Sequence, residues 1–281
     1  MAWNLEGRSA VITGGGSGIG AELARRLARR GMRIGLIDIT DPAGVVPGAE
    51  TAVADVRDTA QLTAAVDDLA RRLGGIDVAV ANAGIATGGP LRMVGPESVE
   101  DTLDVNLLGV WRTARAALPH VLARRGHLLL VASAAAVLPA PGLGAYSASK
   151  AGVEALGRAL RIELRPHGVS VGVAYYLFLA TPMVAAGERS PIFEGTRSKL
   201  PKALGRTWPL EPAVERTVRA IEARRRTVVH PPFLRALMLA RGLLDSPLTD
   251  RASGRSLAQM ERAFEQEAER VGADAAARFK G

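Results

Sequence analysis

The chain has 281 residues, a formal net charge of +8, a hydrophobic fraction of 48% and no cysteine. Its length and hydrophobic content suffice for a sizeable core, which excludes a disordered chain, and the lack of cysteine excludes disulfides and thiolate metal sites. The positive charge comes mostly from arginines spread over expected helix faces without a nucleic-acid-binding motif, so we expect no nucleic-acid partner.

Short apolar runs alternate with segments of helical period from the start of the chain to its middle. The runs are typical of buried parallel strands and lie at residues 10–13, 33–38, 51–54, 77–81, 127–132 and 169–174. Between them, apolar stripes at helical spacing begin near Ile19, Leu62, Val99 and Tyr146. The alternation predicts an α/β fold, a single doubly wound parallel sheet with helices on both faces.

This alternation stops after Thr181. Residues 182–210 contain four prolines and no clear period, and a helix near 211–225 and a strand at 227–230 follow. The remaining residues, 231–281, are helical in pattern and add no strand. We therefore expect one domain over residues 1–230, with a helical C-terminal extension over residues 231–281.

The sequence also carries signals of cellular location and metal content. Its first residues lack the apolar stretch of a signal peptide, and no run reaches the ~20 apolar residues of a spanning helix. The four histidines are scattered without the spacing of metal ligands. We therefore expect a soluble protein of the cytoplasm with no metal site.

A glycine-rich turn, residues 13–20, lies between the first predicted strand and the first predicted helix. Such a turn can hold a pyrophosphate on the helix N-terminus, although consecutive glycines can also simply form a turn. Asp38 ends the next predicted strand eighteen residues after Gly20, about where an acidic side chain meets the ribose of an adenosine. The combination predicts a dinucleotide site.

A phenol and an ammonium occur together later in the chain. Tyr146 and Lys150 are four residues apart, so on a helix they share one face. A cation beside a phenol favours the phenolate, which makes a tyrosine usable for proton transfer near neutral pH. An exposed tyrosine and lysine are the alternative interpretation, but the chain has only three tyrosines. Ser133 precedes Tyr146 by thirteen residues and follows an apolar strand.

Together these motifs resemble the classical short-chain dehydrogenase/reductase family, whose TGxxxGxG, Asn-Ala-Gly, Ser and YxxxK signatures start here at Thr13, Asn82, Ser133 and Tyr146. The resemblance implies a Rossmann-type fold, hydride transfer between a nicotinamide and a secondary alcohol or ketone, and a homodimer or homotetramer. It assigns the catalytic roles to Asn106, Ser133, Tyr146 and Lys150. It assigns cofactor binding to Gly14, Ser17, Gly18, Ile19, Gly20, Asp38, Asp55, Val56, Asn82, Ala83, Gly84, Tyr146, Lys150, Leu179 and Thr181.

The resemblance also gives each catalytic residue a role. Tyr146 is expected to be the general acid/base, and Ser133 to orient the substrate oxygen. Lys150 is expected to bias Tyr146 and to hold the nicotinamide ribose, while Asn106 anchors a proton-relay water.

Cofactor choice follows from the residues around the acidic position. NADP-preferring relatives carry a basic residue just before the second glycine or just after the acidic residue, where this chain has Ser17 and Ile39. A carboxylate at Asp38 accepts hydrogen bonds from ribose hydroxyls and repels a 2′-phosphate. We therefore expect NAD to be preferred to NADP.

The chain departs from the family after the sixth strand, where Tyr176-Leu177 replaces the usual Pro-Gly and is expected to place bulk beside the nicotinamide. The segment 182–210 is the expected substrate loop. Its apolar residues favour a lipophilic alcohol or ketone of steroid-, terpenoid- or lipid-like character, and its cations leave open a carboxylate or phosphate on the substrate.

Two other functions stay open: a non-catalytic nucleotide-binding sensor or scaffold on the same fold, and an NADPH-dependent ketone reductase.

The apolar segment 231–244, which contains arginines, is too short to span a bilayer. We expect it to form a lid or a subunit contact, with contact to a membrane surface less favoured. The last helix, around residues 257–270, is expected to face solvent.

Overall fold

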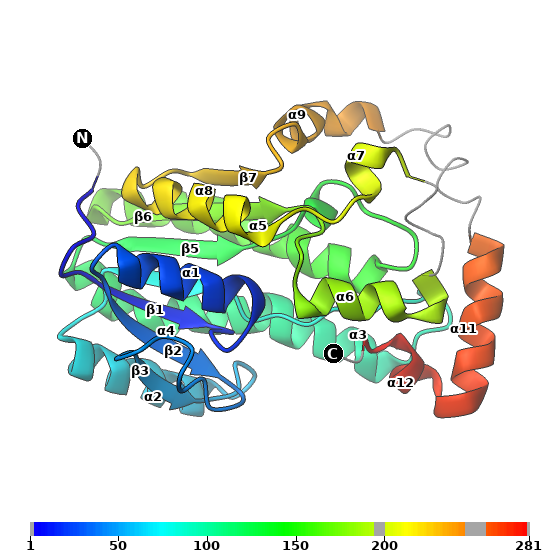
Figure 1. Ribbon diagram of the computed structural model, residues 1–281, viewed down its shortest axis with the longest axis horizontal. Coiled ribbons are helices and arrows are strands. Elements are labelled where there is room, and N and C mark those ends of the chain that lie inside the picture. The colour runs from blue at the N-terminus through cyan, green and yellow to red at the C-terminus, as the bar shows by residue number, and fades with distance from the viewer. Residues whose placement is uncertain (1–2, 194–199, 245–256, 280–281) are drawn as a thin grey trace.

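The computed structural model describes residues 3–193, 200–244 and 257–279. Over these residues, seven strands form one parallel sheet in the order β3-β2-β1-β4-β5-β6-β7 (Figure 1). The strands are β1 (Ser9–Thr13), β2 (Arg33–Asp38), β3 (Glu50–Val53), β4 (Val78–Ala81), β5 (His127–Val131), β6 (Ser170–Tyr176) and β7 (Thr227–His230). Each lies at a run expected from the sequence, so the predicted α/β fold with a doubly wound sheet is confirmed.

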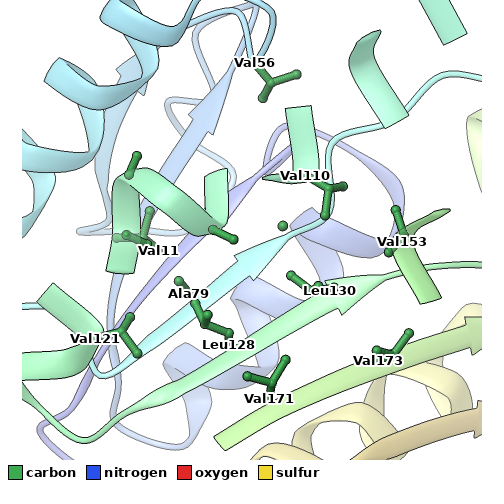
Figure 2. Close-up of a cluster of buried hydrophobic side chains, with 14 of the residues drawn as sticks. Val11, Val56, Ala79, Val110, Val121, Leu128, Leu130, Val153, Val171 and Val173 are labelled. Carbon is green, nitrogen blue, oxygen red and sulfur yellow. The ribbon is translucent and has the colours of Figure 1, made fainter. Parts of the chain in front are cut away.

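Helices cover both faces of the sheet. One face carries α1 (Gly18–Arg29) and α8 (Leu210–Glu222), which pack against each other. The opposite face carries α2 (Thr59–Leu73), α4 (Gly109–Ala123) and α5 (Gly144–Leu164). Figure 2 shows this second layer, in which Val11, Leu128 and Val171 of the strands share a buried cluster with Val121 and Val153 of the helices.

The strand order reverses between β1 and β4. The chain runs outward from β1 through β2 to β3, and it then returns to place β4 on the other side of β1. Such a switch point opens a crevice at the carboxyl ends of the strands. The glycine turn follows β1 and the Asn82-Ala83-Gly84 motif follows β4, so the topology brings these two predicted motifs side by side.

Local sequence signals fix the ends of the helices that flank the sheet. Asp58 accepts hydrogen bonds from the main-chain N–H groups of Ala60 and Gln61, both at 2.9 Å, at the start of α2. The helix ends at Gly74, whose φ of +68° is the left-handed conformation that favours glycine. Thr181 precedes α6 (Pro182–Arg189) as its N-cap, and a proline occupies the first helical position.

The helix that carries Asn106 is not uniform. Helix α3 (Pro96–Leu103) continues through one π-helical turn, Asp104–Leu108, directly into α4. The stripe that begins near Val99 therefore does form a helix, but the helix is widened at one turn. Asn106 lies in that turn and is fully buried, and π-helical turns are frequent at functional sites.

After β7 the chain adds helices and no strand among the described residues. These helices are α9 (Leu234–Leu244), α11 (Leu257–Val271) and α12 (Ala273–Ala277), and the short helix α7 (Lys202–Gly205) precedes α8. The expectation that the last long helix faces solvent is wrong for one of its faces. Met260 and Phe264, four residues apart on α11, are each 1% exposed and pack with Ile192 and Ala277. In Figure 1, α11 stands beyond the carboxyl ends of the strands.

Helix α9 packs on its own chain along one side. Leu234 is fully buried, and Leu237 and Met238 pack against the core cluster, whereas Leu239 is 86% exposed. Of the helices in residues 3–193, 200–244 and 257–279, none combines the length and the apolar character needed to cross a bilayer.

The packing of α5 on β6 predicts a stability effect. A methyl group on Gly157 of α5 would collide with Val173 of β6, whose β-branched side chain is fully buried. Gly157→Ala should therefore lower the free energy of unfolding by about 1–2 kcal/mol, although alanine is the better helix former. Urea denaturation measures this loss. In the matched variant Gly242→Ala on α9 the added methyl meets nothing within 4 Å, so its stability should stay equal or rise; a gain in both variants would contradict the packing.

Candidate functional site

The glycine turn after β1 lies directly against the chain after β4. A Cβ on Gly14 would be 2.7 Å from Ala83 Cα, and one on Gly20 would collide with the Gly14 carbonyl. Asn82 holds the two segments together, because its Nδ2 donates hydrogen bonds to the carbonyls of Thr13 at 3.0 Å and Gly14 at 2.9 Å. Only glycine fits this approach, so the turn can present its N–H groups at the start of α1.

Asp38, at the end of β2, is fixed beside this turn. Its Oδ2 accepts a hydrogen bond from the Gly16 N–H and its Oδ1 accepts one from the Ile39 N–H, each at 2.8 Å. Each carboxylate oxygen keeps a further lone pair, and Asp38 lines the cavity described below. The residue after Asp38 is Ile39, which is uncharged, so this position provides no cation next to the carboxylate. Ile39 is 66% exposed.

The segment after β3 forms the far end of the site. Val56 is buried at the cavity wall, and Asp55 lies beside it. The Arg57 guanidinium, 2.7 Å from Asp55 Oδ2, hydrogen-bonds this carboxylate and holds its pKa below the ordinary value. Arg57 also lines the cavity, and the sequence analysis missed it because no family signature includes it.

Tyr146 and Lys150 lie on α5 and face Ser133, which follows β5. Burial raises the pKa of Tyr146, and a hydrogen bond with the Ser133 side chain opposes that rise. Lys150 Nζ lies 5.7 Å from the centre of the Tyr146 ring and donates a hydrogen bond to the Val131 carbonyl at 3.1 Å. Burial lowers the pKa of Lys150 to about 8. In the protein alone, burial therefore outweighs the expected effect of Lys150 on the phenol, and Tyr146 stays protonated at neutral pH.

Asn106 acts on the main chain. Its Oδ1 accepts a hydrogen bond from the Ile85 N–H at 2.8 Å, and its Nδ2 donates to the Ile85 carbonyl at 2.9 Å and to Ser149 Oγ at 3.3 Å. A Cβ on Gly84 would be 3.0 Å from Asn106 Oδ1 and 3.5 Å from Lys150 Nζ, so the amide and the ammonium lie close to each other. The visible role of Asn106 is to fix the segment after β4 beside Lys150.

One cavity of about 1760 Å³ joins these groups. It is lined by most of the residues that the sequence singles out, namely Gly14, Ser17, Gly18, Ile19, Asp38, Asp55, Val56, Asn82, Ala83, Gly84, Ser133, Tyr146, Lys150, Leu179 and Thr181. Gly20 and Asn106 are not part of its lining and support it from behind. The sequence-predicted residues are thus brought together in one place.

Tyr176 and Leu177 both line the cavity, and their side chains have different neighbours. The Tyr176 hydroxyl lies 2.6 Å from Thr217 Oγ1 of α8, so the tip of its ring is directed to the other face of the sheet. The Leu177 N–H donates to the His230 carbonyl at 3.0 Å, which extends the pairing of β6 with β7. Leu177 packs in the core cluster with α5 and lines the cavity. Both residues therefore add bulk to the cavity wall, while the Tyr176 hydroxyl is bound outside the cavity by Thr217.

Leu179 and Thr181 follow on the same segment. Leu179 forms a bridge to Trp208, and the Ala180 N–H donates to the Trp208 carbonyl at 2.9 Å. A Cβ on Gly18 would be 3.5 Å from Thr181 Cγ2, which places Thr181 against the glycine turn. These contacts hold the segment at the boundary between the two ends of the cavity.

The end of the cavity beyond Tyr146 is mainly apolar. Residues that the sequence analysis did not assign line it, among them Ile85, Val137, Leu138, Leu237 and Phe279. They come from loops and from the C-terminal helices, where no family signature occurs. A usable signal was present for the tail, because Met260 and Phe264 recur at helical spacing in an otherwise charged segment.

The charged groups at this end are engaged within the protein. Arg241 Nη1 is 3.0 Å from Glu154 Oε1, and Arg278 Nη2 is 2.7 Å from Asp101 Oδ2. The loop 182–210 contains five cations. Arg197 and Lys199 lie outside the described residues, and Arg189, Lys202 and Arg206 are absent from the cavity lining. Within the part of the chain that the structure describes, no cluster of His, Asp or Glu could hold a metal ion.

The glycine turn lies at the switch point of a parallel sheet, where α/β proteins bind dinucleotides. A tyrosine and a lysine share the same cavity, and this combination is typical of an α/β oxidoreductase. The family model described as short chain dehydrogenase matches residues 8–190. The chain belongs to the short-chain dehydrogenase family and is an oxidoreductase that acts on CH–OH groups.

Relatives agree with this assignment. A (-)-trans-carveol dehydrogenase of Rhodococcus erythropolis is 37% identical over 204 residues, which cover 64% of this chain and 74% of the relative. An NAD-dependent oxidoreductase of Mycobacterium tuberculosis is 35% identical over 205 residues, again 64% of this chain and 74% of the relative. The crystal structure of a carveol dehydrogenase from Mycobacterium avium in complex with NAD is 29% identical, with a TM-score of 0.71, and covers 81% of this chain and 96% of that one.

The orientation of Tyr176 gives a testable outcome. Tyr176→Phe removes a buried hydroxyl while Thr217 keeps its 2.9 Å hydrogen bond to the Ala213 carbonyl, so we expect a loss of about 1 kcal/mol in the free energy of unfolding. The kcat/KM for an alcohol should stay within about twofold of wild type. Urea denaturation and steady-state kinetics measure the two quantities. A large drop in kcat/KM without a change in stability would show that the hydroxyl serves the cavity after all.

Proposed function

We propose that the protein is an NAD(H)-dependent oxidoreductase that interconverts a secondary alcohol and a ketone, on a neutral, lipophilic substrate. The observation that carries the proposal is the shared cavity, in which Ser133, Tyr146 and Lys150 lie at the apolar end and the glycine turn and Asp38 lie at the other. An oxidoreductase of this kind needs a dinucleotide and a proton-transfer group to meet at one carbon atom.

The cavity fits the dinucleotide. The glycine turn is a cradle that a Cβ at Gly14 or Gly20 would fill, and it leads into the N-terminus of α1, where a pyrophosphate is stabilised. Gly14, Ser17, Gly18 and Ile19 would hold the pyrophosphate there. When bound, the nicotinamide supplies the carbon that takes or gives the hydride, and in its oxidised form it adds positive charge next to Tyr146.

Other residues would hold the remaining parts of the cofactor. Asp38 would accept hydrogen bonds from the adenosine ribose, and Asp55 and Val56 would lie against the adenine. Lys150 would hold the nicotinamide ribose. Leu179 and Thr181 would contact the carboxamide.

The proton is moved by the chain's own residues. Ser133 positions the substrate oxygen, and the Tyr146 hydroxyl donates a proton to a ketone oxygen or receives one from an alcohol. Because burial keeps Tyr146 protonated in the protein alone, the phenol is ready to donate in reduction. Oxidation requires the phenolate, which Lys150 favours while it is charged, below its pKa of about 8.

The character of the substrate follows from the cavity beyond Tyr146. Its wall is mainly apolar, and Arg241 and Arg278 are paired with carboxylates of the same chain, so they offer no free charge to an anionic group. These observations favour a neutral, terpenoid-like alcohol over a carboxylate or phosphate. The likeness to carveol dehydrogenases supports the same class.

We also propose that the chain forms a homodimer or homotetramer. The support is a set of exposed apolar side chains on the helices of one face: Leu108 at the end of the π-helical turn, Trp111 on α4 and Ile162 on α5. The non-catalytic sensor or scaffold is not supported, since Ser133, Tyr146 and Lys150 are all present and share one cavity.

The role of Tyr146 is tested by Tyr146→Phe. We expect turnover to fall by about 10²–10⁴-fold, because the variant keeps the ring and loses the transferable proton. NAD affinity, measured by calorimetry, should change little. Tyr176→Phe, which removes a buried hydroxyl outside the reaction, is the matched control. A Tyr146→Phe enzyme with more than about a tenth of the wild-type kcat would refute the assignment.

Cofactor choice is tested at Asp38 and Ile39. Asp38→Ala should weaken NAD binding by the loss of ribose hydrogen bonds, about tenfold. Asp38→Ala with Ile39→Arg should in addition admit NADP, since it removes the repelling carboxylate and adds a cation at an exposed position. The measurement is kcat/KM with each cofactor. If wild type already prefers NADP, the reductase alternative replaces the NAD assignment.

A further inference from the structure

The C-terminal segment 257–279 is docked on its own chain, and its end lines the cavity. Helix α11 packs against the turn Pro191–Phe193, and α12 packs against α3. The Gly88 N–H donates a hydrogen bond to the Ala277 carbonyl at 2.8 Å, and Thr87 forms an antiparallel bridge with Arg278. The tail is thus tied by its main chain to the segment that follows β4.

Glycines occupy the points where side chains of the tail press on the catalytic domain. A Cβ on Gly142 would be 2.6 Å from Met260 Sδ, and one on Gly95 would collide with the Asp274 carboxylate. A Cβ on Gly88 would be 2.8 Å from the Phe279 ring. Any larger residue at these three positions would push the tail away. The surface under the tail is therefore complementary in shape to the tail.

The end of this tail reaches the cavity. Phe279 lines it together with Phe193, and the two rings meet edge to face with their centres 5.4 Å apart. A Cβ on Gly187 of α6 would be 3.3 Å from the Phe279 ring. The neighbouring ion pair of Arg278 with Asp101 holds the main chain next to Phe279 in place. The ring is therefore held on three sides by the tail, Phe193 and α6.

We propose that Phe279 is a specificity-determining residue, which closes the substrate end of the cavity and sets an upper limit on the size of the alcohol. The inference rests on the proposed function, because it takes the apolar end of the cavity as the substrate site. It predicts a preference for compact alcohols over extended ones, since the ring occupies the space that a long chain would need.

The test compares Phe279→Ala with wild type on 2-butanol, 2-hexanol, 2-octanol and 2-decanol. Removing the ring should raise kcat/KM for 2-decanol relative to 2-butanol by about tenfold or more, mainly through KM. Phe279→Leu, which keeps an apolar side chain, should give an intermediate ratio. Leu239→Ala on α9, at an exposed position outside the cavity lining, is the control and should leave the ratio unchanged.

Binding of each alcohol is also measured, as the rise in Tm that it causes in the presence of NAD. This is done for wild type, Phe279→Ala, Phe279→Leu and Leu239→Ala. The role of Phe279 would be overturned by a folded Phe279→Ala protein that keeps the wild-type ratio of 2-decanol to 2-butanol, both in kcat/KM and in the Tm shifts. Should Phe279→Ala fail to fold, the ratio in Phe279→Leu decides in the same way. Stabilisation by the alcohols without turnover in wild type would reject the proposed reaction while the Tm series still decides the role of Phe279. If no alcohol binds wild type, both proposals fall.

Discussion

The site depends on direct contact between the chain after β1 and the chain after β4. Gly14 and Gly20 leave no side chain in the way, and the Asn82 amide binds the carbonyls of Thr13 and Gly14 across the gap. The same turn receives the Asp38 carboxylate on the Gly16 N–H. One close packing of main chain thereby sets the distance between the N-terminus of α1 and the Asp38 carboxylate, which any side chain at these glycines would enlarge.

Burial of Tyr146 and Lys150 disfavours the charged form of each, since it raises the pKa of the phenol and lowers that of the ammonium. Proximity of the two groups does not by itself produce a phenolate. The positive charge of an oxidised nicotinamide would change this balance at the moment when oxidation needs it. Electrostatic interactions between buried groups are stronger than they would be in water, so an added charge next to Tyr146 has a larger effect there.

The fold and the grouping of the predicted residues around one cavity were largely predictable from the sequence, because strand runs, glycine spacing and the Tyr146–Lys150 pair are local patterns. The apolar end of the cavity was not. The direction of Tyr176 depends on Thr217 in a distant helix, and the buried face of α11 depends on what covers Met260 and Phe264. Sequence spacing shows which residues share a face of a helix, but long-range packing decides which face is buried.

The tail also contacts the helix that leads into Asn106. Helix α3 begins after Gly95, which has no side chain to cap it, and Asp274 supplies the missing acceptor by binding the Ser98 N–H at 2.8 Å. The buried Ser98 hydroxyl donates in turn to the Asp274 carbonyl at 3.0 Å. Because α3 runs straight into the π-helical turn that carries Asn106, the docked tail and the Asn106 clamp on Ile85 share one continuous helix. A tail that contributes Phe279 to the cavity and a cap to this helix therefore connects the wall of the cavity to the Asn106 clamp on the segment after β4.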